Sequence, residues 1–296
     1  MAKELKESTI AEYEKKLNKI QRDVEIEDPV GIMDWLEKMG FGESTKKAYL
    51  SAVKYDFGRK GSAFPEVLQK EINRLYGIQN QRADAQVMTP KQEERMVDWE
   101  TVRVKAHQYI RDYNVVPLSG KGPKVPRPDN GVDYDERVWI AGLYTFQAPV
   151  RADYGDMLVS KGKSAGDDVG NELVMRGRED SYFIFRDYKT AKTYGNVEII
   201  LEPEMWDLFG GEWFVGAYAG EYIFADKSSK QFSSMVLDTF EEILGVKGFG
   251  VSMLRHSYIM HMFPKLKTIR QKEELAKSML HSRITQENYN LVGTAD

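Results

Sequence analysis

The stretch that decides the fold is GVSMLRHSYIMHMFPKLK, residues 250–267. It places Arg255 and His256 in the middle of an apolar segment with the character of a core helix. An arginine is costly to bury unless an anionic group compensates its charge. The segment therefore predicts that Arg255 points out of the core toward an anion. Ser252 stands one helical turn earlier, and by itself it favours a helix N-cap.

The segments on either side of this stretch are predicted to be helices. SSKQFSSMVLDTFEEILG, residues 228–245, repeats apolar side chains at helical spacing and has Gly245 as its stop signal. TIRQKEELAKSMLHSR begins at Thr268, which is a suitable cap. Upstream, DERVWIAGLYTFQAPV, residues 135–150, is apolar all round, and this indicates a buried helix.

Two further segments have strand character. DMLVS, residues 156–160, predicts one strand, followed by the loop KGKSAGDDVGN. SYFIFRDYKTAKTYGNVEIIL, residues 181–201, predicts a hairpin with its turn near residues 193–196. We therefore expect a mainly helical domain with a small three-stranded antiparallel sheet.

The first 77 residues predict a bundle of four short helices, and Ser44 is expected to cap the third. A polar stretch follows and is interpreted as a linker around residues 78–90. The predicted class is α+β, with a helical domain over residues 1–85, a linker and helix start over 86–97, and a second domain over 98–296.

Composition excludes several classes of site. The chain of 296 residues has no cysteine, so disulfides and thiolate metal sites are ruled out, and an intracellular protein is expected. We expect no signal peptide and no membrane span. Motifs for metalloproteases, calcium loops, phosphate loops and serine hydrolases are missing, so no metal or other cofactor is predicted. The net charge of −4 argues weakly against nucleic-acid binding, although basic residues concentrated on one face would offset it.

An ordered set of polar residues remains in the second domain. Two arginines, a lysine, a histidine and a tyrosine suit phosphodiester transesterification without metal, because guanidinium groups match the non-bridging oxygens of its transition state. A lysine can protonate the leaving oxygen, and a tyrosine can act as nucleophile. The candidates are Arg151, Lys189 or Lys192, Arg255, His281 and Tyr289.

These motifs, in this order, resemble the tyrosine recombinases, or phage-integrase family, particularly those of viruses and mobile elements. QAPVRADYGDM resembles the first arginine box, YKTAKTYG the hairpin lysine segment, SMLRHSY the box usually written His-x-x-Arg, and LHSRITQENY the ending with histidine and tyrosine. STIAEYEKKL and STKKAYLSAVKYDF resemble helices of the family's core-binding domain. The resemblance covers most of the chain.

The resemblance implies a DNA recombinase or integrase that needs neither metal nor ATP. Arg151 and Arg255 would bind the scissile phosphate and His281 would hydrogen-bond a non-bridging oxygen. Lys189, or less favourably Lys192, would be the general acid. Tyr289 would form a 3′-phosphotyrosyl bond with double-stranded DNA. The protein would self-associate on DNA as a dimer or tetramer, in the cytoplasm or nucleus of a host.

The sequence departs from the family pattern at Ser252, where a histidine is usual. Serine can hydrogen-bond a phosphate, but it cannot act as a base near neutral pH. His256, one turn further on, is a possible substitute. The core-binding domain of the family clamps DNA, so Lys46, Lys47 and Lys54 are candidate DNA contacts. Lys192 in the hairpin of the second domain is a further candidate, and the alternative for each is a solvated surface lysine.

Other interpretations stay open. Arg151 suits an ion pair with Asp153 or Asp156, Arg255 a snorkelling side chain, and His256 and His261 satisfied structural residues. His281 suits a helix C-terminus, and Tyr289 a packing role. The same chemistry also fits a type IB-like topoisomerase or telomere resolvase, which the short sequence after Tyr289 favours. A non-catalytic DNA-binding relative is a third possibility, which Ser252 permits.

Overall fold

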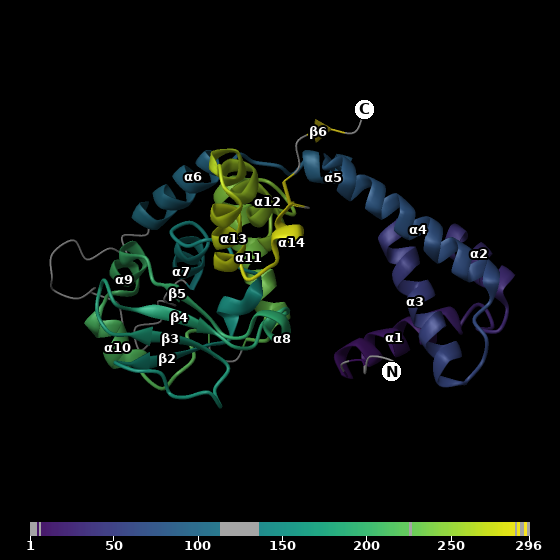
Figure 1. The fold of residues 1–296 in the computed structure, drawn as a ribbon, viewed down its shortest axis with the longest axis horizontal. Coiled ribbons are helices and arrows are strands. Elements are labelled where there is room, and N and C mark those ends of the chain that lie inside the picture. The colour runs from purple at the N-terminus through teal and green to yellow at the C-terminus, as the bar shows by residue number, and fades with distance from the viewer. Residues whose placement is uncertain are drawn as a thin grey trace. The chain divides into compact units, whose positions relative to one another are not determined.

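The structure is a computed structural model that describes residues 5, 7–112, 136–224, 227–287, 289–290 and 293–294. The chain divides into two compact units, residues 1–85 and 86–296 (Figure 1). Each unit has its own apolar core. The described part is mostly helical, and its one larger sheet belongs to the second unit.

The first unit contains the helices α1 (Glu7–Ile20), α2 (Pro29–Lys38), α3 (Glu43–Arg59) and α4 (Glu66–Ala85). Its core contains apolar residues from all four helices, including Leu17, Trp35, Leu50 and Leu68. Asp28 caps α2 by accepting hydrogen bonds from the amides of Val30 and Gly31, at 3.1 and 3.0 Å.

Two details of the first unit differ from expectation. The N-cap of α3 is Gly42 and not Ser44, which lies inside the helix. The polar segment after Gly77, expected to be a linker, continues α4 to Ala85. The lack of apolar residues there had suggested a loop, but Gln, Arg and Ala are good helix formers and extend a helix that the core has already started.

The second unit contains most of the secondary structure. Its elements in chain order are β1 (Val87–Met88), α5 (Pro90–Glu93), α6 (Trp99–Asp112), α7 (Glu136–Leu143), η2 (Ala152–Gly155), β2 (Met157–Lys161), β3 (Asn171–Met175), β4 (Tyr182–Phe185), α8 (Ala191–Tyr194), β5 (Val197–Ile200), α9 (Pro203–Phe209), α10 (Glu212–Tyr218), α11 (Ser229–Leu244), α12 (Val251–Met262), η3 (Phe263–Lys265), α13 (Ile269–Ser278), α14 (Arg283–Glu287) and β6 (Gly293–Thr294).

The predicted three-stranded antiparallel sheet is wrong in two respects. The sheet has four strands in the order β2–β3–β4–β5, and it is mixed, because β2 and β3 run parallel. The unrecognised strand is β3, NELVM, which lacks the alternation that marks a half-buried strand because all five of its residues are buried. The pairing of β4 with β5 is antiparallel as predicted, but their connection contains the short helix α8 and is not a tight turn.

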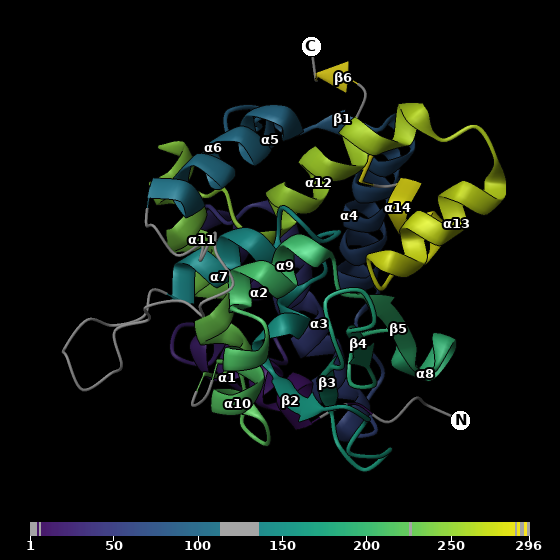
Figure 2. The same cartoon turned by 90° about the vertical axis from the view of Figure 1, so that its left-hand side faces the viewer.

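The helices around the candidate site follow their sequence signals. α7 is buried on all sides from Val138 to Leu143. α11 starts with a capping box between Ser228 and Gln231 and ends at Gly245, whose φ of +73° is accessible to glycine without strain. Thr268 and Gln271 form a second capping box at the start of α13. Figures 1 and 2 show the sheet at one end of this unit, with α6, α12 and α13 gathered at the other.

Candidate functional site

Arg255 lies in α12 and is the most deeply buried charged side chain of the site, at 1% exposure. Its Nη1 donates to the backbone oxygens of Pro149, at 2.8 Å, and Met279, at 3.1 Å. Its Nη2 lies 2.9 Å from Nδ1 of His281. Its Nε is buried with no partner among the described residues. The prediction that Arg255 points out of the core is therefore wrong, because the guanidinium is enclosed and ties together the segments before Arg151 and after α13.

The contact with Arg255 decides which nitrogen of His281 carries the proton. A guanidinium can only donate, so Nδ1 of His281 must accept and the proton resides on Nε2. Burial lowers the pKa of His281 to about 3, and the nearby charges of Arg255 and Arg151 act in the same direction. The imidazole is thus neutral. Its Nε2–H is a buried donor without a partner in the described part of the chain.

The backbone before His281 is unusual. α13 ends at Ser278, and Leu280 has a φ of +54°, in the left-handed region that favours glycine. The amide of His281 then donates to the oxygen of Ala276, at 3.1 Å. This sharp helix end turns His281 back toward Arg255. A buried leucine kept in a strained conformation is typical of a functional constraint.

Arg151 joins the same cluster from the segment between α7 and β2. The Tyr144 hydroxyl donates to its backbone oxygen at 2.5 Å. Burial lowers the pKa values of both Arg255 and His281, and the positive charge of Arg151 acts in the same direction on both. Its Nη1 is buried and unpartnered among the described residues, where it forms no ion pair with Asp153 or Asp156. Burial raises the pKa of the Asp153 carboxyl, although Arg151 and Arg255 oppose that shift.

Tyr289 follows α14 and lies against both Arg255 and His281. The guanidinium carbon of Arg255 is 5.1 Å from the centre of its ring, and the ring of His281 is 5.8 Å away. The ring is half-buried. The structure thus brings four predicted residues together: Arg151, Arg255, His281 and Tyr289.

His256 packs against Tyr289 and is buried rather than exposed to solvent. Its ring centre is 4.6 Å from that of Tyr289, and its Nδ1 is 3.0 Å from the backbone oxygen of Tyr289. Burial lowers its pKa. Its Nε2 lies 3.4 Å from Nε2 of the Gln92 side chain in α5. Sequence reasoning overlooked Gln92, whose only signal was its place in the capping box with Thr89.

Ser252 does not cap α12. The N-cap is Gly250, and Ser252 is an exposed residue of the first turn that makes no hydrogen bond with the described residues. Its interpretation as a helix cap is therefore wrong. Its correspondence to the usual histidine stays a prediction.

Lys189 and Lys192 lie in the connection between β4 and β5. The backbone of this connection passes close to His281, but the side chains of the two lysines do not touch that residue. Thr190 donates from its hydroxyl to the oxygen of Leu280 at 3.2 Å, which holds this connection beside the cluster. Both lysines are exposed: Lys189 in a turn, Lys192 within α8. Neither makes a side-chain contact with the other predicted residues in the described part of the structure.

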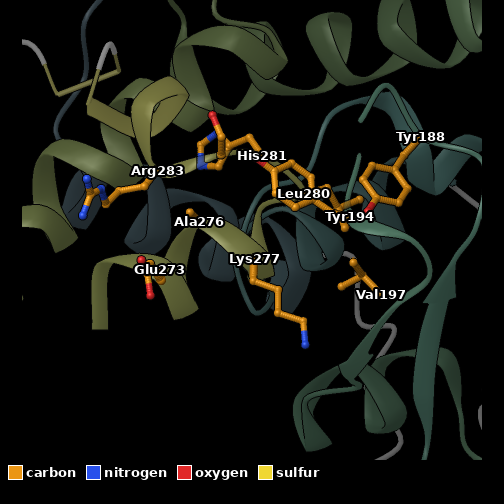
Figure 3. Close-up of a pocket in the computed structure, with 10 residues that line it drawn as sticks. Tyr188, Tyr194, Val197, Glu273, Ala276, Lys277, Leu280, His281 and Arg283 are labelled. Atoms are coloured by element: carbon orange, nitrogen blue, oxygen red, sulfur yellow. The ribbon is translucent and has the colours of Figure 1, made fainter. Parts of the chain in front are cut away.

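A cavity of about 460 Å³ separates this connection from α13 (Figure 3). Tyr188 and Tyr194 form one side of it, and His281 and Leu280 lie between these tyrosines and Arg283. The remaining lining residues are Val197, Glu273, Ala276, Lys277 and Ser282. The cavity gives the edge of the cluster an open side on which a ligand can approach His281.

The predicted DNA contacts of the first unit lie on α3. Lys46 is engaged with Glu37 at 2.5 Å. Lys47 hydrogen-bonds Gln79 and lies over the ring of Tyr76, and Lys54 hydrogen-bonds Gln69 at 2.7 Å. Of the three, only Lys46 is paired with a carboxylate among the described residues. The positive charges of Lys47 and Lys54 are therefore not neutralised by an ion pair there.

The described residues offer neither a metal-binding cluster nor a membrane-spanning helix. They include no group of three or more histidine, aspartate or glutamate side chains arranged to hold a metal ion. None of their helices combines the length and the apolar character that crossing a membrane requires.

Comparison with solved structures gives a weak likeness, and the other comparisons give none. No protein-family model matches the chain, and no curated protein matches it. A solved structure of XerA recombinase is similar over 97% of this chain and 88% of that chain, with 14% sequence identity and a TM-score of 0.40. At this TM-score, the likeness is too weak to establish a shared fold.

Proposed function

We propose that this protein is a DNA strand transferase of the tyrosine recombinase type, with Tyr289 as its nucleophile. One observation carries the proposal. Three buried N–H donors, from Arg255 Nε, Arg151 Nη1 and His281 Nε2, lie in one cluster beside a tyrosine and lack partners among the described residues. Buried donors are nearly always satisfied, so three together indicate a missing acceptor.

The chemistry of these donors indicates an anion with several oxygens. Two guanidinium groups repel one another and are costly to bury together without a compensating negative charge. Among the described residues neither forms an ion pair, and burial raises the pKa of the Asp153 carboxyl, which both guanidinium groups influence. A phosphodiester supplies one negative charge and two non-bridging oxygens, which suit planar guanidinium donors.

Each candidate residue has one role in the proposed reaction. Tyr289 loses its hydroxyl proton to solvent, and its oxygen bonds to phosphorus while the bond from phosphorus to the 5′ oxygen breaks. Lys189 or Lys192 protonates that 5′ oxygen. Arg151, Arg255 and the Nε2–H of His281 bind the non-bridging oxygens, where charge accumulates in the transition state. Attack of a 5′ hydroxyl on the phosphotyrosyl bond reverses the reaction and rejoins DNA.

The proposed substrate is double-stranded DNA inside a host cell. Lys47 and Lys54 of the first unit, together with Lys192, are the proposed phosphate contacts, and binding should weaken steeply with added salt. Recombination between two sites further requires that two or more copies assemble on DNA. This requirement separates a recombinase from a topoisomerase that uses the same chemistry.

The test is covalent capture of the protein on DNA. A pool of nicked duplexes with randomised sequence is incubated with the protein in EDTA, and denaturant-resistant adducts are separated and sequenced. Wild type should form an adduct and Tyr289→Phe should form none. Tyr222→Phe, which alters an exposed tyrosine, is the matched control and should behave as wild type. An adduct that persists in Tyr289→Phe, or that requires Mg²⁺, contradicts the mechanism.

A further inference from the structure

We infer that His256 is a positioning residue that holds the backbone of Tyr289, and that Gln92 holds His256 in the tautomer this requires. The inference deepens the proposed function, since it concerns the residue proposed as nucleophile. It rests on a chain of hydrogen bonds in which the donor and the acceptor can be assigned for each bond.

The chain begins at the capping box of α5. The backbone amide and the hydroxyl of Thr89 both lie 2.9 Å from Oε1 of Gln92, which identifies that atom as the amide oxygen. The other end of the Gln92 amide, Nε2, therefore donates, and it lies 3.4 Å from Nε2 of His256. A nitrogen that faces this donor must accept, so the proton of the neutral imidazole resides on Nδ1.

The Nδ1–H then donates to the backbone oxygen of Tyr289, at 3.0 Å. His256 is 7% exposed, and its depressed pKa agrees with a neutral ring. The Tyr289 ring also lies against His256, at 4.6 Å between ring centres, and against the guanidinium of Arg255, at 5.1 Å. His256 thus contacts Tyr289 through both its backbone and its ring.

Two more contacts connect the same segments. Gln86 donates from its side chain to the oxygen of Glu287 at 3.2 Å. β1 pairs with β6 in parallel, with Val87 opposite Gly293 and Met88 opposite Thr294 (Figure 2). The first residues of the second unit, 86–92, therefore hold the chain before, at and after Tyr289. A histidine that only filled space in the core would not explain why contacts from residues 86–92 meet at the segment around Tyr289.

Tyr289 needs such support because it lies outside regular structure. α14 ends at Glu287, and local hydrogen bonds hold the next residues, from the amides of Tyr289 and Asn290 to the oxygens of Gln286 and Glu287. A single turn outside a regular helix opens more readily than a packed helix does. A displacement of about 1 Å in a reacting group can lower a rate by about 10²-fold. Positioning from His256 would prevent that loss.

The test compares His256→Ala with His256→Asn, whose side-chain amide can place an N–H near the former Nδ1. Hydrogen exchange at the amides of Tyr289 and Asn290 reports the hold on the segment without any reaction. We expect His256→Ala to speed this exchange and lower the adduct rate at least tenfold, and His256→Asn to restore most of both. Gln92→Glu keeps the acceptor for Thr89 but removes the donor, so it should show a smaller loss. Glu93→Gln, on an exposed neighbour, should change neither.

A second measurement reads the tautomer directly in the folded wild-type protein. Nitrogen-15 chemical shifts of His256 should show the proton on Nδ1. A proton on Nε2, or exchange and adduct rates that His256→Ala leaves unchanged, would overturn the inference. If wild type forms no adduct but His256→Ala still speeds exchange, the proposed function fails while the positioning role stands.

Discussion

Nη2 of Arg255 lies 2.9 Å from Nδ1 of His281, and this contact leaves the Nε2–H of His281 as a buried donor without a partner among the described residues. The arginine thus does more than carry charge. It determines the tautomer of a neighbouring histidine and leaves that histidine ready to donate to an oxygen.

Replacing either arginine of the cluster should slow the chemical step more than it weakens DNA binding. Arg255→Lys keeps a positive charge but cannot donate to the oxygens of Pro149 and Met279 and to His281 in the same geometry. Arg151→Ala removes a single guanidinium. Each change should lower the adduct rate by about 10²-fold or more. Rate and affinity are measured on the same nicked duplex, and equal losses in both would contradict a role in the transition state.

His281 should make stability depend on pH. Its folded pKa, about 3, lies below the ordinary value of 6.5, so the unfolded chain binds more protons between these values. The contribution of the neutral imidazole to the free energy of unfolding is complete at pH values above the ordinary pKa. It declines as the pH falls below that pKa, and about 2 kcal/mol of it is lost at about pH 5. His281→Gln cannot titrate and should show a flatter decline in urea unfolding between pH 7 and 5. His256 shifts in the same direction, so the comparison with the variant is the test. Parallel declines would contradict it.

Ser252→His tests the departure from the family pattern. Because Ser252 is exposed and does not cap α12, the change should alter the free energy of unfolding by no more than about 0.5 kcal/mol. If the position corresponds to the usual histidine, the adduct rate should stay the same or rise. A severalfold drop in rate with unchanged stability would show that a histidine does not fit there.

The general acid can be identified with a modified leaving group. A duplex with sulfur in place of the bridging 5′ oxygen has a leaving thiolate that does not need protonation. Lys189→Ala should lose most of its adduct rate on the ordinary duplex and recover on the sulfur duplex. Lys192→Ala, on the same exposed connection, should show a small loss on both. The reverse pattern would assign the role to Lys192.

The buried ion pair between Arg186 and Glu172 provides a test of the fold around β3. Nη1 of Arg186 lies 3.0 Å from Oε2 of Glu172 in β3, where the two side chains are 9% and 0% exposed. Arg186→Met leaves a buried carboxylate uncompensated and should lower the free energy of unfolding by about 3–5 kcal/mol. Arg178→Met breaks an exposed pair with Asp207 and should leave unfolding nearly unchanged. Similar midpoints for the two variants would contradict the burial of Glu172.

The helices were largely predictable from the sequence, because the signals that form them are local. The apolar spacing of α11, its stop at Gly245 and the cap of α13 at Thr268 depend on residues within a few positions of one another. The strand β3 was missed because it is buried on both faces, so its sequence does not alternate between polar and apolar residues. Glu172 has the character of a surface residue in the sequence, and it can be buried only because Arg186, Ser164 and the amide of Ala165 pair with its carboxylate in the fold.

The sequence by itself determined the residue types of the candidate site and their order, since the needs of phosphodiester chemistry restrict the side chains that can serve. Only the tertiary structure decided what these residues do to one another. It enclosed Arg255, set the tautomers of His281 and His256, and joined Gln92 to Tyr289 across the unit. The physical reason is that burial and hydrogen-bond direction depend on groups that are distant in sequence, and periodicity carries no information about them.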